Sequence, residues 1–386
     1  MNPFYHSSFQ LGVLGGGQLG RMFIQEALNY NVSIHILDPD ASAPCKDIAS
    51  SFTNGKLTDE VTVLNFGKNK NLLTIEIEHV SVEALKKLEA SGIPVYPQPH
   101  LLEMIQDKGL QKEFYKSNGI PTADFFIVNN IPEILQYASH FPFFQKLRKG
   151  GYDGRGVMKL TNPGDLSAAF SEPSVLEKMV DFEKEISVIV ARNTKGEIAH
   201  FPVVECEFSP KANLVEFLFA PALLSPSIEK TAVEIARKVA EKMQIVGLLA
   251  VEMFVTKQGE VLVNEVAPRP HNSGHHTIEA NVTSQYEQHL RAILGLPLGS
   301  TELIRPAVMV NLLGEEGHSG EAVYEGMEEL MKMEGVFIHL YGKKHTRPFR
   351  KMGHVTVIGK TIDDAREKAL IVKQKLKVVT TEKEKI

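Results

Sequence analysis

Two apolar runs separated by a Gln-Gly pair constrain the fold of this chain more than any other stretch. Residues 248–256 and 260–266 flank Gln258-Gly259, and this pattern predicts a β-hairpin. If the loop has two residues, the register places Glu252 directly opposite Glu265. Two carboxylates about 5 Å apart repel each other unless they share a cation or a proton. The hairpin therefore predicts a cation site with oxygen ligands, and Mg²⁺ beside nucleotide phosphates suits it.

The alternative interpretation of this hairpin is an edge pair whose two glutamates face water. The polar residues that follow argue against it, because they are too dense and too varied for an ordinary hairpin exit. Strand alternation also predicts that Asn264 points away from Glu265. The residues that indicate a ligand site beside the hairpin are Arg269, His271, Asn272, His275 and His276.

Length and composition exclude several classes of protein. The 386 residues suit two to three domains of about 150 residues each. A net charge of −5 argues against broad binding to nucleic acid or to anionic membranes. We expect no membrane span and no secretion signal, and therefore a cytoplasmic protein. Cys45 and Cys206 have neither metal nor redox spacing, so we expect no disulfide.

The N-terminal stretch has a glycine-rich loop between a strand and a helix. Residues 15–20 match G-x-G-x-x-G, and the next strand ends at Asp38, which is typical of an NAD site. Because nothing downstream supplies hydride transfer, we favour the phosphate of another ligand at this helix N-terminus. A further strand at 71–78 ends with Glu76 and Glu78 on one face, and one of them is expected to face a ligand.

Two more stretches carry clustered cations. After a helix expected at 101–117, residues 149–156 hold four glycines, and Arg148, Lys149 and Arg155 add positive charge. This composition favours a loop that covers phosphates over a plain turn. Near the C-terminus, basic residues lie between two expected strands and predict either a second anion site or a solvated charged run. They include Lys343, Arg350 and Lys351.

Together the motifs resemble the ATP-grasp superfamily and, within it, the N5-carboxyaminoimidazole ribonucleotide synthase family. The resemblance covers nearly the whole chain and implies an α/β and α+β fold in three parts. These are a Rossmann-like pre-ATP-grasp domain at 1–100, an ATP-grasp domain at 101–296 with a lid at about 122–182, and a small C-terminal domain at 297–386. The motifs that carry it, in the family's order, are GVLGGGQLGRM at 12–22, TIEIEHV at 74–80, GGYDGRG at 150–156, NEVAPRPHNSGHH at 264–276 and RKMGHVTV at 350–357.

This resemblance implies an ATP-dependent ligase that forms a carbon–nitrogen bond in de novo purine biosynthesis. ATP, bicarbonate and 5-aminoimidazole ribonucleotide would give N5-carboxyaminoimidazole ribonucleotide, ADP and phosphate through carboxyphosphate. The implied cofactors are ATP and Mg²⁺, with Mn²⁺ as an alternative metal. The family also implies a homodimer, to which Phe23, Ile24 or Leu28 would contribute unless they are core, and delivery of the product to a carboxyaminoimidazole ribonucleotide mutase.

The resemblance assigns roles to individual residues. Glu252 and Glu265 would be the metal ligands. The nucleotide would be bound by Lys108, Lys146, Gly151, Tyr152, Asp153, Gly154, Arg155, Gly156, Val157, Glu177, Lys178, Met179, Val180, Glu185, Asn264 and Glu265. The ribonucleotide would be bound by Gln18, Leu19, Glu76, Asn272, Lys343, Arg350 and Lys351. The catalytic set would be Tyr152, Asp153, Arg155 and Arg269, with Asp153 orienting the amine and Arg269 stabilising the bicarbonate-derived anion.

Two other functions remain open at this point. One is a related ATP-grasp ligase, the formate-dependent glycinamide ribonucleotide transformylase, which typically has Glu where Gln18 stands here. The other is a nucleotide sensor that keeps the fold without catalysis. The presence of Glu252, Glu265 and Arg269 argues against a sensor.

Overall fold

The computed structural model describes residues 4–151, 156–209, 211 and 214–381. The N-terminal part forms a parallel sheet with strand order β3-β2-β1-β4, which confirms the Rossmann-like expectation. Its apolar strands and the buried stripe of α1 form one core. The elements are β1 (Gln10–Leu14), α1 (Gln18–Asn29), β2 (Ser33–Asp38), β3 (Ser51–Asn54), α2 (Glu60–Gly67), β4 (Leu72–Ile75) and α3 (Val82–Ala90).

One helix was expected at 101–117, and the structure has two instead, α4 (Pro99–Ile105) and α5 (Lys108–Ser117). The break falls at Asp107, whose carboxylate accepts from the backbone N–H groups of Gly109 at 2.9 Å and Leu110 at 3.3 Å. An aspartate at this position satisfies N–H groups that a helix start leaves without partners. The break places Lys108 in the first turn of α5.

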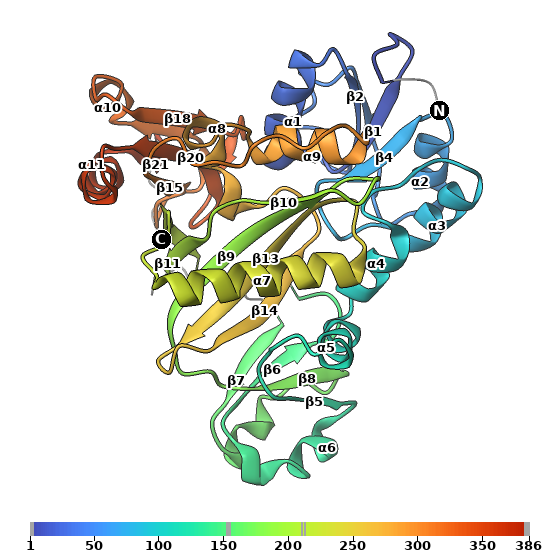
Figure 1. The fold of residues 1–386 in the computed structure, drawn as a ribbon, viewed down its shortest axis with the longest axis vertical. Helices are drawn as coiled ribbons and strands as arrows, with labels where there is room; N and C mark the ends of the chain where they lie inside the picture. The colour runs from blue at the N-terminus through green and yellow to red at the C-terminus, as the bar shows by residue number, and fades with distance from the viewer. Residues whose placement is uncertain (1–3, 152–155, 210, 212–213, 382–386) are drawn as a thin grey trace.

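A small antiparallel sheet follows α5 and projects from the rest of the molecule (Figure 1). Its strand order is β5-β8-β6-β7, and buried apolar side chains on these strands and α6 form its own core. We call this sheet with its short helices the lid. Its elements are β5 (Phe125–Val128), α6 (Ile131–Leu135), η1 (Ala138–His140), β6 (Phe143–Leu147), β7 (Val157–Leu160), η2 (Pro163–Ser167) and β8 (Ser174–Lys178).

A nine-stranded sheet forms the body, in the order β14-β13-β9-β11-β12-β15-β20-β18, with β10 paired to β9. Helix α7 (Pro226–Met243) buries its apolar stripe in the same core as β9, β13 and β14 and lies across these strands in Figure 1. The other elements here are β9 (Phe182–Arg192), β10 (Ile198–His200), β11 (Val204–Phe208), β12 (Val215–Ala220), β13 (Gly247–Thr256), β14 (Val261–Ala267), η3 (Asn272–Gly274), α8 (Thr277–Ala280) and α9 (Gln285–Ile293).

The C-terminal part extends the body sheet, because β12 pairs with β15 and β15 pairs with β20. The sheet therefore continues across the expected boundary near residue 297, and the bounds of the three domains stay predictions. Among the described residues, every helix is too short or too polar to span a bilayer. The C-terminal elements are β15 (Ala307–Leu313), β16 (Gly320–Glu321), β17 (Val323–Glu325), α10 (Met327–Leu330), β18 (Val336–Leu340), β19 (His345–Thr346), β20 (Lys351–Ile358), α11 (Ile362–Lys375) and β21 (Lys377–Val379).

The hairpin of β13 and β14 has the expected pairing of Glu252 with Glu265, but a different loop. The N–H of Thr256 donates to the carbonyl of Glu260 at 2.9 Å, so the loop has three residues and not two. This shifts the pairing near the loop by one residue. A β-bulge at Asn264 then shifts it back before Glu265, because Met253 pairs with Val263 while Glu252 pairs with Glu265.

Two of the three α1 residues considered for a dimer interface are buried inside the subunit. Phe23 and Ile24 are each only 3% exposed and belong to the N-terminal core. Because their side chains lie inside the subunit, they are not interface residues in this structure. Leu28 remains a candidate, since its side chain is 68% exposed.

Candidate active site

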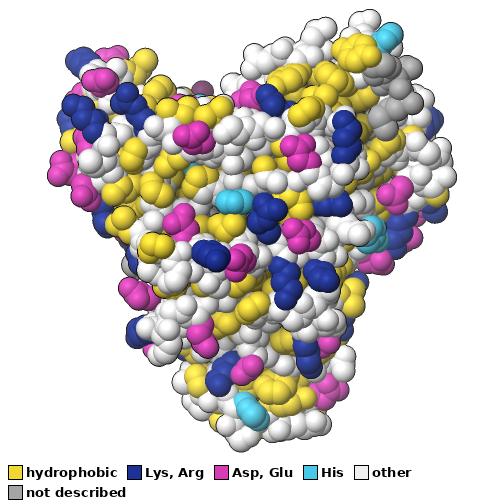
Figure 2. Space-filling view, viewed as in Figure 1, with side chains coloured by type: hydrophobic (Ala, Val, Ile, Leu, Met, Phe, Trp, Pro, Cys, Tyr) yellow, Lys and Arg dark blue, Asp and Glu magenta, His cyan; other side chains and the backbone are white. Residues whose placement is uncertain are grey.

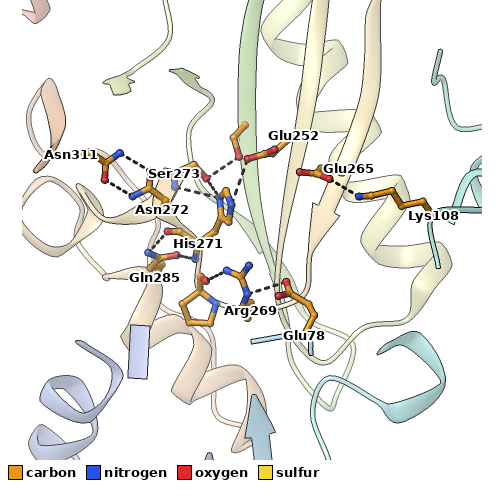
Figure 3. Close-up of polar contacts among 12 residues, drawn as sticks. Glu78, Lys108, Glu252, Glu265, Arg269, His271, Asn272, Ser273, Gln285 and Asn311 are labelled. Atoms are coloured by element: carbon orange, nitrogen blue, oxygen red, sulfur yellow. Dashed lines mark hydrogen bonds and ion pairs between the residues drawn. The ribbon is translucent and has the colours of Figure 1, made fainter. Parts of the chain in front are cut away.

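The two hairpin glutamates have different partners. Lys108 Nζ, from the first turn of α5, lies 3.2 Å from Glu265 Oε2. His271 Nε2 lies 3.5 Å from Glu252 Oε1, but burial holds the pKa of His271 well below its usual value, so this contact involves a neutral ring. Figure 3 shows both glutamates with these partners on opposite sides of the hairpin.

The proton affinities of the two carboxyls consequently differ. Burial, and then the charges of Glu265 and Glu185, raise the pKa of Glu252. Burial also opposes ionisation of Glu265, but Lys108 and Lys146 outweigh it and lower the pKa of that carboxyl. A close carboxyl pair with one member kept ionised and the other pushed towards the neutral form is suited to binding a cation.

The donor set fits a magnesium ion that also binds phosphate. Among the residues that the structure describes, no cluster of three or more His, Cys, Asp or Glu side chains is arranged to hold a metal. The chain therefore offers the two opposed carboxylates of Glu252 and Glu265. Mg²⁺ is commonly bound by one or two carboxylates together with substrate phosphates and water.

A buried ion cluster lies on the lid side of the hairpin. Glu177, from β8, is 5% exposed and contacts two ammonium groups, Lys146 Nζ at 2.9 Å and Lys112 Nζ at 3.4 Å. These two charges outweigh burial and lower the pKa of Glu177. Lys146 also donates to Asn264 Oδ1 at 3.2 Å. The cluster links α5, two lid strands and β14.

The contact from Lys146 shows that the expectation for Asn264 was wrong. Alternation predicted that Asn264 points away from Glu265. The bulge at Asn264 interrupts the alternation, and both side chains bond lysines of the same region, Asn264 with Lys146 and Glu265 with Lys108. The structure thus brings both predicted nucleotide ligands together through their side chains.

Lys112 belongs to this cluster although the sequence did not assign it a role. Its side chain is 2% exposed, and its Nζ donates to Thr122 Oγ1 at 2.7 Å. Burial lowers the pKa of Lys112 to about 8, against the opposing charge of Glu177. The spacing from Lys108, one helical turn earlier, was the available signal, because residues four apart share a helix face.

The second glycine-rich loop is described at its two ends. The N–H of Leu147 donates to the carbonyl of Gly156 at 2.8 Å, which closes the loop at its base. Gly156 has φ +70°, and a Cβ there would lie 3.2 Å from the Cα of Gly151. The positive φ and the close approach of the two ends of the loop both favour glycine at this position. The predicted residues Tyr152, Asp153, Gly154 and Arg155 lie outside the described residues.

Arg148, one of the cations expected to cover phosphates, binds a carboxylate of the chain itself in this structure. Its Nε and a terminal nitrogen each lie 2.8 Å from the Asp107 carboxylate, in a two-point ion pair. Its carbonyl also accepts from the N–H of Lys108 at 2.9 Å. Arg148 therefore anchors the base of the loop to the start of α5 and helps to position Lys108.

The other nucleotide residues expected from the sequence lie on β7, β8 and β9 and in the connection between β8 and β9, which forms the hinge of the lid. Lys178 points towards Asp124, with the charged atoms 3.9 Å apart and both side chains exposed. Met179 and Val180 follow and connect the lid to β9. On β9, burial and then the charge of Glu265 raise the pKa of Glu185 to about 7. Val157 begins β7 and has an exposed side chain.

The N-terminal glycine loop already binds carboxylates of the chain itself. The N–H of Gly16 donates to Asp38 Oδ2 at 2.6 Å, and the N–H of Leu19 donates to Glu76 Oε1 at 3.1 Å. These bonds argue against a phosphate at the same groups and against an NAD site. Burial raises the pKa of Glu76 to about 7, with Arg269 opposing the shift. Gln18 begins α1 beside this carboxyl.

Arg269 lies between the hairpin and the N-terminal sheet. Its Nε is 2.9 Å from Glu78 Oε1, and a terminal nitrogen donates to the carbonyl of Pro270 at 3.0 Å (Figure 3). The Nε–H is buried, and no described acceptor meets it with good hydrogen-bond geometry. Burial opposes the charge of Arg269, but Glu78, then Glu76 and Glu252, raise its pKa above the usual value.

Asn272 is fixed by a reciprocal amide pair. Its Nδ2 donates to Asn311 Oδ1, and Asn311 Nδ2 donates to Asn272 Oδ1, each at 2.9 Å (Figure 3). The pair joins η3 to β15 and fixes the direction of both amides. His275 and His276, each 1% exposed, point into the protein and are not positioned as ligands. The two histidines that the sequence grouped with the ligand site are therefore packing residues of the protein interior.

The C-terminal cations lie near the hairpin and near the loop that follows β2. Lys343 Nζ donates to the carbonyl of Lys351 at 2.8 Å, and Arg350 donates to the carbonyl of His345 at 2.6 Å. Hydrogen bonds from Ser42 chiefly lower the pKa of Asp40, and the charge of Arg350 adds to this effect. The charge of Lys351 acts on Glu252 and His271. The structure thus brings the predicted C-terminal cations close to the hairpin site and the loop after β2.

Three family models match successive parts of the chain. The ribonucleotide synthetase preATP-grasp domain matches residues 9–106, and the ATP-grasp domain matches residues 113–286. The phosphoribosylaminoimidazole carboxylase C-terminal domain matches residues 307–368. The three matches follow the order of the N-terminal sheet, the lid with the body, and the C-terminal extension.

Curated relatives match over nearly the whole chain. The chloroplastic phosphoribosylaminoimidazole carboxylase of Vigna aconitifolia is 38% identical over 94% of this chain and 66% of its own length. The chain thus spans about two thirds of that carboxylase. The N5-carboxyaminoimidazole ribonucleotide synthase of Bacillus subtilis is 37% identical over 92% of both chains.

Solved structures agree with these relatives. N5-carboxyaminoimidazole ribonucleotide synthetase from Thermotoga maritima has a TM-score of 0.89 and 47% identity, covering 96% of this chain and 99% of its own. The Aspergillus clavatus synthase with ADP and 5-aminoimidazole ribonucleotide has a TM-score of 0.86 and 32% identity, covering 95% and 98%. The fold and the site therefore define an ATP-grasp enzyme. The chain belongs to the N5-carboxyaminoimidazole ribonucleotide synthase family.

Proposed function

We propose that this ATP-grasp ligase carboxylates the amine of 5-aminoimidazole ribonucleotide in purine biosynthesis, using ATP and bicarbonate and releasing ADP and phosphate. Membership of the family supports this reaction. The observation that carries it for this chain is the opposition of Glu252 and Glu265, with Lys108 on one side and Arg269 near the other. This arrangement can bind a metal–phosphate group next to a second anion.

The nucleotide is proposed to lie between the lid and the hairpin. Lys108 and Lys146 would bind its phosphates and its adenine side, and both ammonium groups are already held by carboxylates in this region. Glu177 and Val180 would contact adenine at the hinge, and Glu185 would accept from the ribose hydroxyls. Gly151 and the loop up to Val157 would cover the phosphates, supported by the closed base of the loop.

Glu252 and Glu265 are the proposed metal ligands. Mg²⁺, or Mn²⁺ as an alternative, would supply positive charge to the phosphate oxygens during phosphoryl transfer. Through this metal ion, the two carboxylates would hold the nucleotide phosphates beside the hairpin. Lys108 keeps Glu265 ionised, which favours cation binding at physiological pH.

The chemistry is proposed to proceed through carboxyphosphate. A bicarbonate oxygen attacks the terminal phosphorus of ATP and displaces ADP. Carboxyphosphate then breaks to CO₂ and phosphate, and the amine of the ribonucleotide attacks CO₂ and loses a proton. Arg269 is proposed to stabilise the anions in these steps, because its guanidinium keeps its charge although it is buried, and that charge acts on Glu252. Closure of the glycine loop would exclude water, since carboxyphosphate hydrolyses readily.

The ribonucleotide is proposed to bind across the N-terminal loop and the C-terminal cations. Asn272 would use an amide whose direction is fixed by Asn311. Glu76 would contact the imidazole end, with the N–H of Leu19 orienting its carboxylate. The other proposed ligands are Gln18, Lys343, Arg350 and Lys351. Tyr152, Asp153 and Arg155 would act from the glycine loop, with Asp153 orienting the amine.

The experiment that tests this function measures ADP release with pairs of substrates. We expect turnover with 5-aminoimidazole ribonucleotide plus bicarbonate, and at least a hundredfold less with glycinamide ribonucleotide plus formate. Faster turnover with the second pair would assign the transformylase reaction instead. ATP turnover that neither ribonucleotide stimulates would support a sensor. Homodimer formation, delivery to a mutase and a cytoplasmic location stay predictions.

A further inference from the structure

A cavity of about 570 Å³ lies beside the lid hinge. Of the described residues proposed to bind the nucleotide or the ribonucleotide, Lys178 alone is among its lining residues. The cavity is bordered by the last turns of α5, by the chain entering the lid and by the end of β8. The lining residues are Lys116, Gly119, Ile120, Pro121, Thr122, Ala123, Asp124, Phe125, Phe126, His140, Phe143 and Lys178. The volume falls within the range of small-molecule sites, about 300–1,000 Å³.

The lining combines aromatic rings with cations. Phe125 and Phe126 are half-buried, and Phe126 packs inside the lid against Tyr137 and the buried Phe143. Lys116 Nζ already lies over the Phe125 ring, 5.9 Å from its centre. A hydrophobic patch bordered by charged side chains and a histidine is visible on the lid in Figure 2, below α5. Ring faces beside ammonium groups suit a flat aromatic ligand that carries a negative charge.

The charges at the rim favour an anion. Lys116 and Lys178 are both exposed, and Asp124 is the carboxylate in the lining. The contact between Lys178 and Asp124 is long, at 3.9 Å, and both partners are exposed to water. Such a pair contributes little stability, so an incoming anion can replace Asp124 as the partner of Lys178 at small cost.

One wall of the cavity is also a wall of the nucleotide cluster. Thr122 lines the cavity while its Oγ1 accepts from Lys112, which contacts Glu177. Phe125 pairs directly with Glu177 across β5 and β8. The cavity is also lined by the segment that enters the lid, residues 119–124, and by Lys178 at the end of β8. A ligand here therefore contacts α5, the hinge and the lid together, and resists changes in the angle between lid and body.

We propose that this cavity is a second ligand site, separate from the catalytic cleft, for a small planar aromatic anion. The half-buried ring of Phe125 would bind the face of the ligand, and Lys116 and Lys178 its negative group. The class includes nucleoside monophosphates and aromatic carboxylates. The site goes beyond the proposed reaction, because neither substrates nor metal need it.

The test is calorimetric titration of the full-length enzyme, with and without saturating Mg²⁺ and ADP. Naphthalene-2-carboxylate and guanosine 5′-monophosphate serve as two anionic probes and distinguish the two sources, and naphthalene-2-methanol is the neutral control. Lys116→Glu reverses a rim charge on an exposed side chain. Lys230→Glu makes the same change on α7, where the side chain is 77% exposed and does not line the cavity.

We expect at least one anionic probe to bind one-to-one in the presence of ADP, at least fivefold tighter than the neutral control. Lys116→Glu should weaken this binding at least fivefold, and Lys230→Glu should leave it unchanged. Melting temperatures of both variants within about 2 °C of the parent would show that they are folded. The proposal is overturned if neither anion binds, if ADP displaces the bound anion, or if the two variants behave alike.

Discussion

The opposed glutamates predict that a single substitution stabilises the unliganded enzyme while impairing it. Glu252→Gln removes one negative charge from the pair. For charges about 5 Å apart, the repulsion is about 3 kcal/mol at an effective dielectric constant of about 20. The side chains of Glu252 and Glu265 are 25% and 47% exposed, so water screens part of it. We expect a net stabilisation of about 1–2 kcal/mol.

The pH dependence of this effect follows from the raised pKa of Glu252. A carboxyl whose pKa is raised on folding destabilises the folded protein fully above its folded pKa, and this cost decreases as the pH falls until it vanishes below the pKa of the unfolded chain. The variant should therefore exceed the parent in stability at about pH 9, and the difference should shrink towards about pH 6. Glu260→Gln, on an exposed side chain that directly follows the loop of the same hairpin, is the matched control.

Thermal melting measures the prediction directly. With an unfolding entropy of about 2 cal/mol/K per residue, the stabilisation corresponds to a rise in melting temperature of about 1–3 °C. With saturating Mg²⁺ and ADP the order should reverse, because the parent keeps both proposed metal ligands. A variant that melts no higher than the parent at high pH, and gains as much from Mg²⁺ and ADP, would refute the reasoning.

Four further substitutions test three other parts of the site. Arg269→Ala should lower kcat about 10²–10³-fold with the KM for ATP within about threefold in steady-state assays; near-normal turnover would remove Arg269 from the chemistry. Gly156→Ala should strain the loop, because φ is +70°, and increase ATP hydrolysis not coupled to carboxylation; unchanged coupling would contradict this. Glu177→Gln should cost about 3 kcal/mol in urea unfolding, since it strands two ammonium groups, whereas Lys112→Met should cost less than about half of that; equal losses would contradict the cluster described.

The hairpin shows how a correct prediction can rest on two local errors. The sequence placed Glu252 opposite Glu265 by assuming a two-residue loop and a regular ladder. The actual loop has three residues, with Gly259 at φ +82°, and the bulge at Asn264 compensates for the extra residue. The apolar runs were enough to predict the two strands and the pairing of the two glutamates. The bulge was not, because its residue, an asparagine, carries no signature of irregular pairing.

Long-range partners account for most of what sequence reasoning missed. The Arg269–Glu78 contact joins residues far apart in the chain, and so does the Arg148–Asp107 pair. Local patterns place such charges on helices, strands or loops, but they do not say which opposite charges meet. Asp107 did offer a local signal, because aspartate is a preferred helix N-cap and the structure starts α5 there.

The local sequence pattern also did not predict which polar residues are buried. His275 was expected beside a ligand site, yet its Nδ1 lies 2.9 Å from Tyr286 OH and its ring lies 4.6 Å from that of His354. Tyr286 belongs to α9 and His354 to β20. Only the body and the C-terminal extension together create this environment, so a single sequence leaves the histidines looking like ligands.

The bulge at Asn264 compensates for the three-residue loop, so the pairing at the base of the hairpin does not depend on the length of its tip. Pairing with β9 fixes the course of β13 from Gly247 to Thr256, independently of the loop. The bulge then resets β14 before Glu265, and the loop Lys257–Gly259 is exposed. A small reporter peptide or fluorescent label inserted at the tip should therefore leave the spacing of the two carboxylates intact. This position offers a place to attach a probe close to the catalytic cleft without rebuilding it.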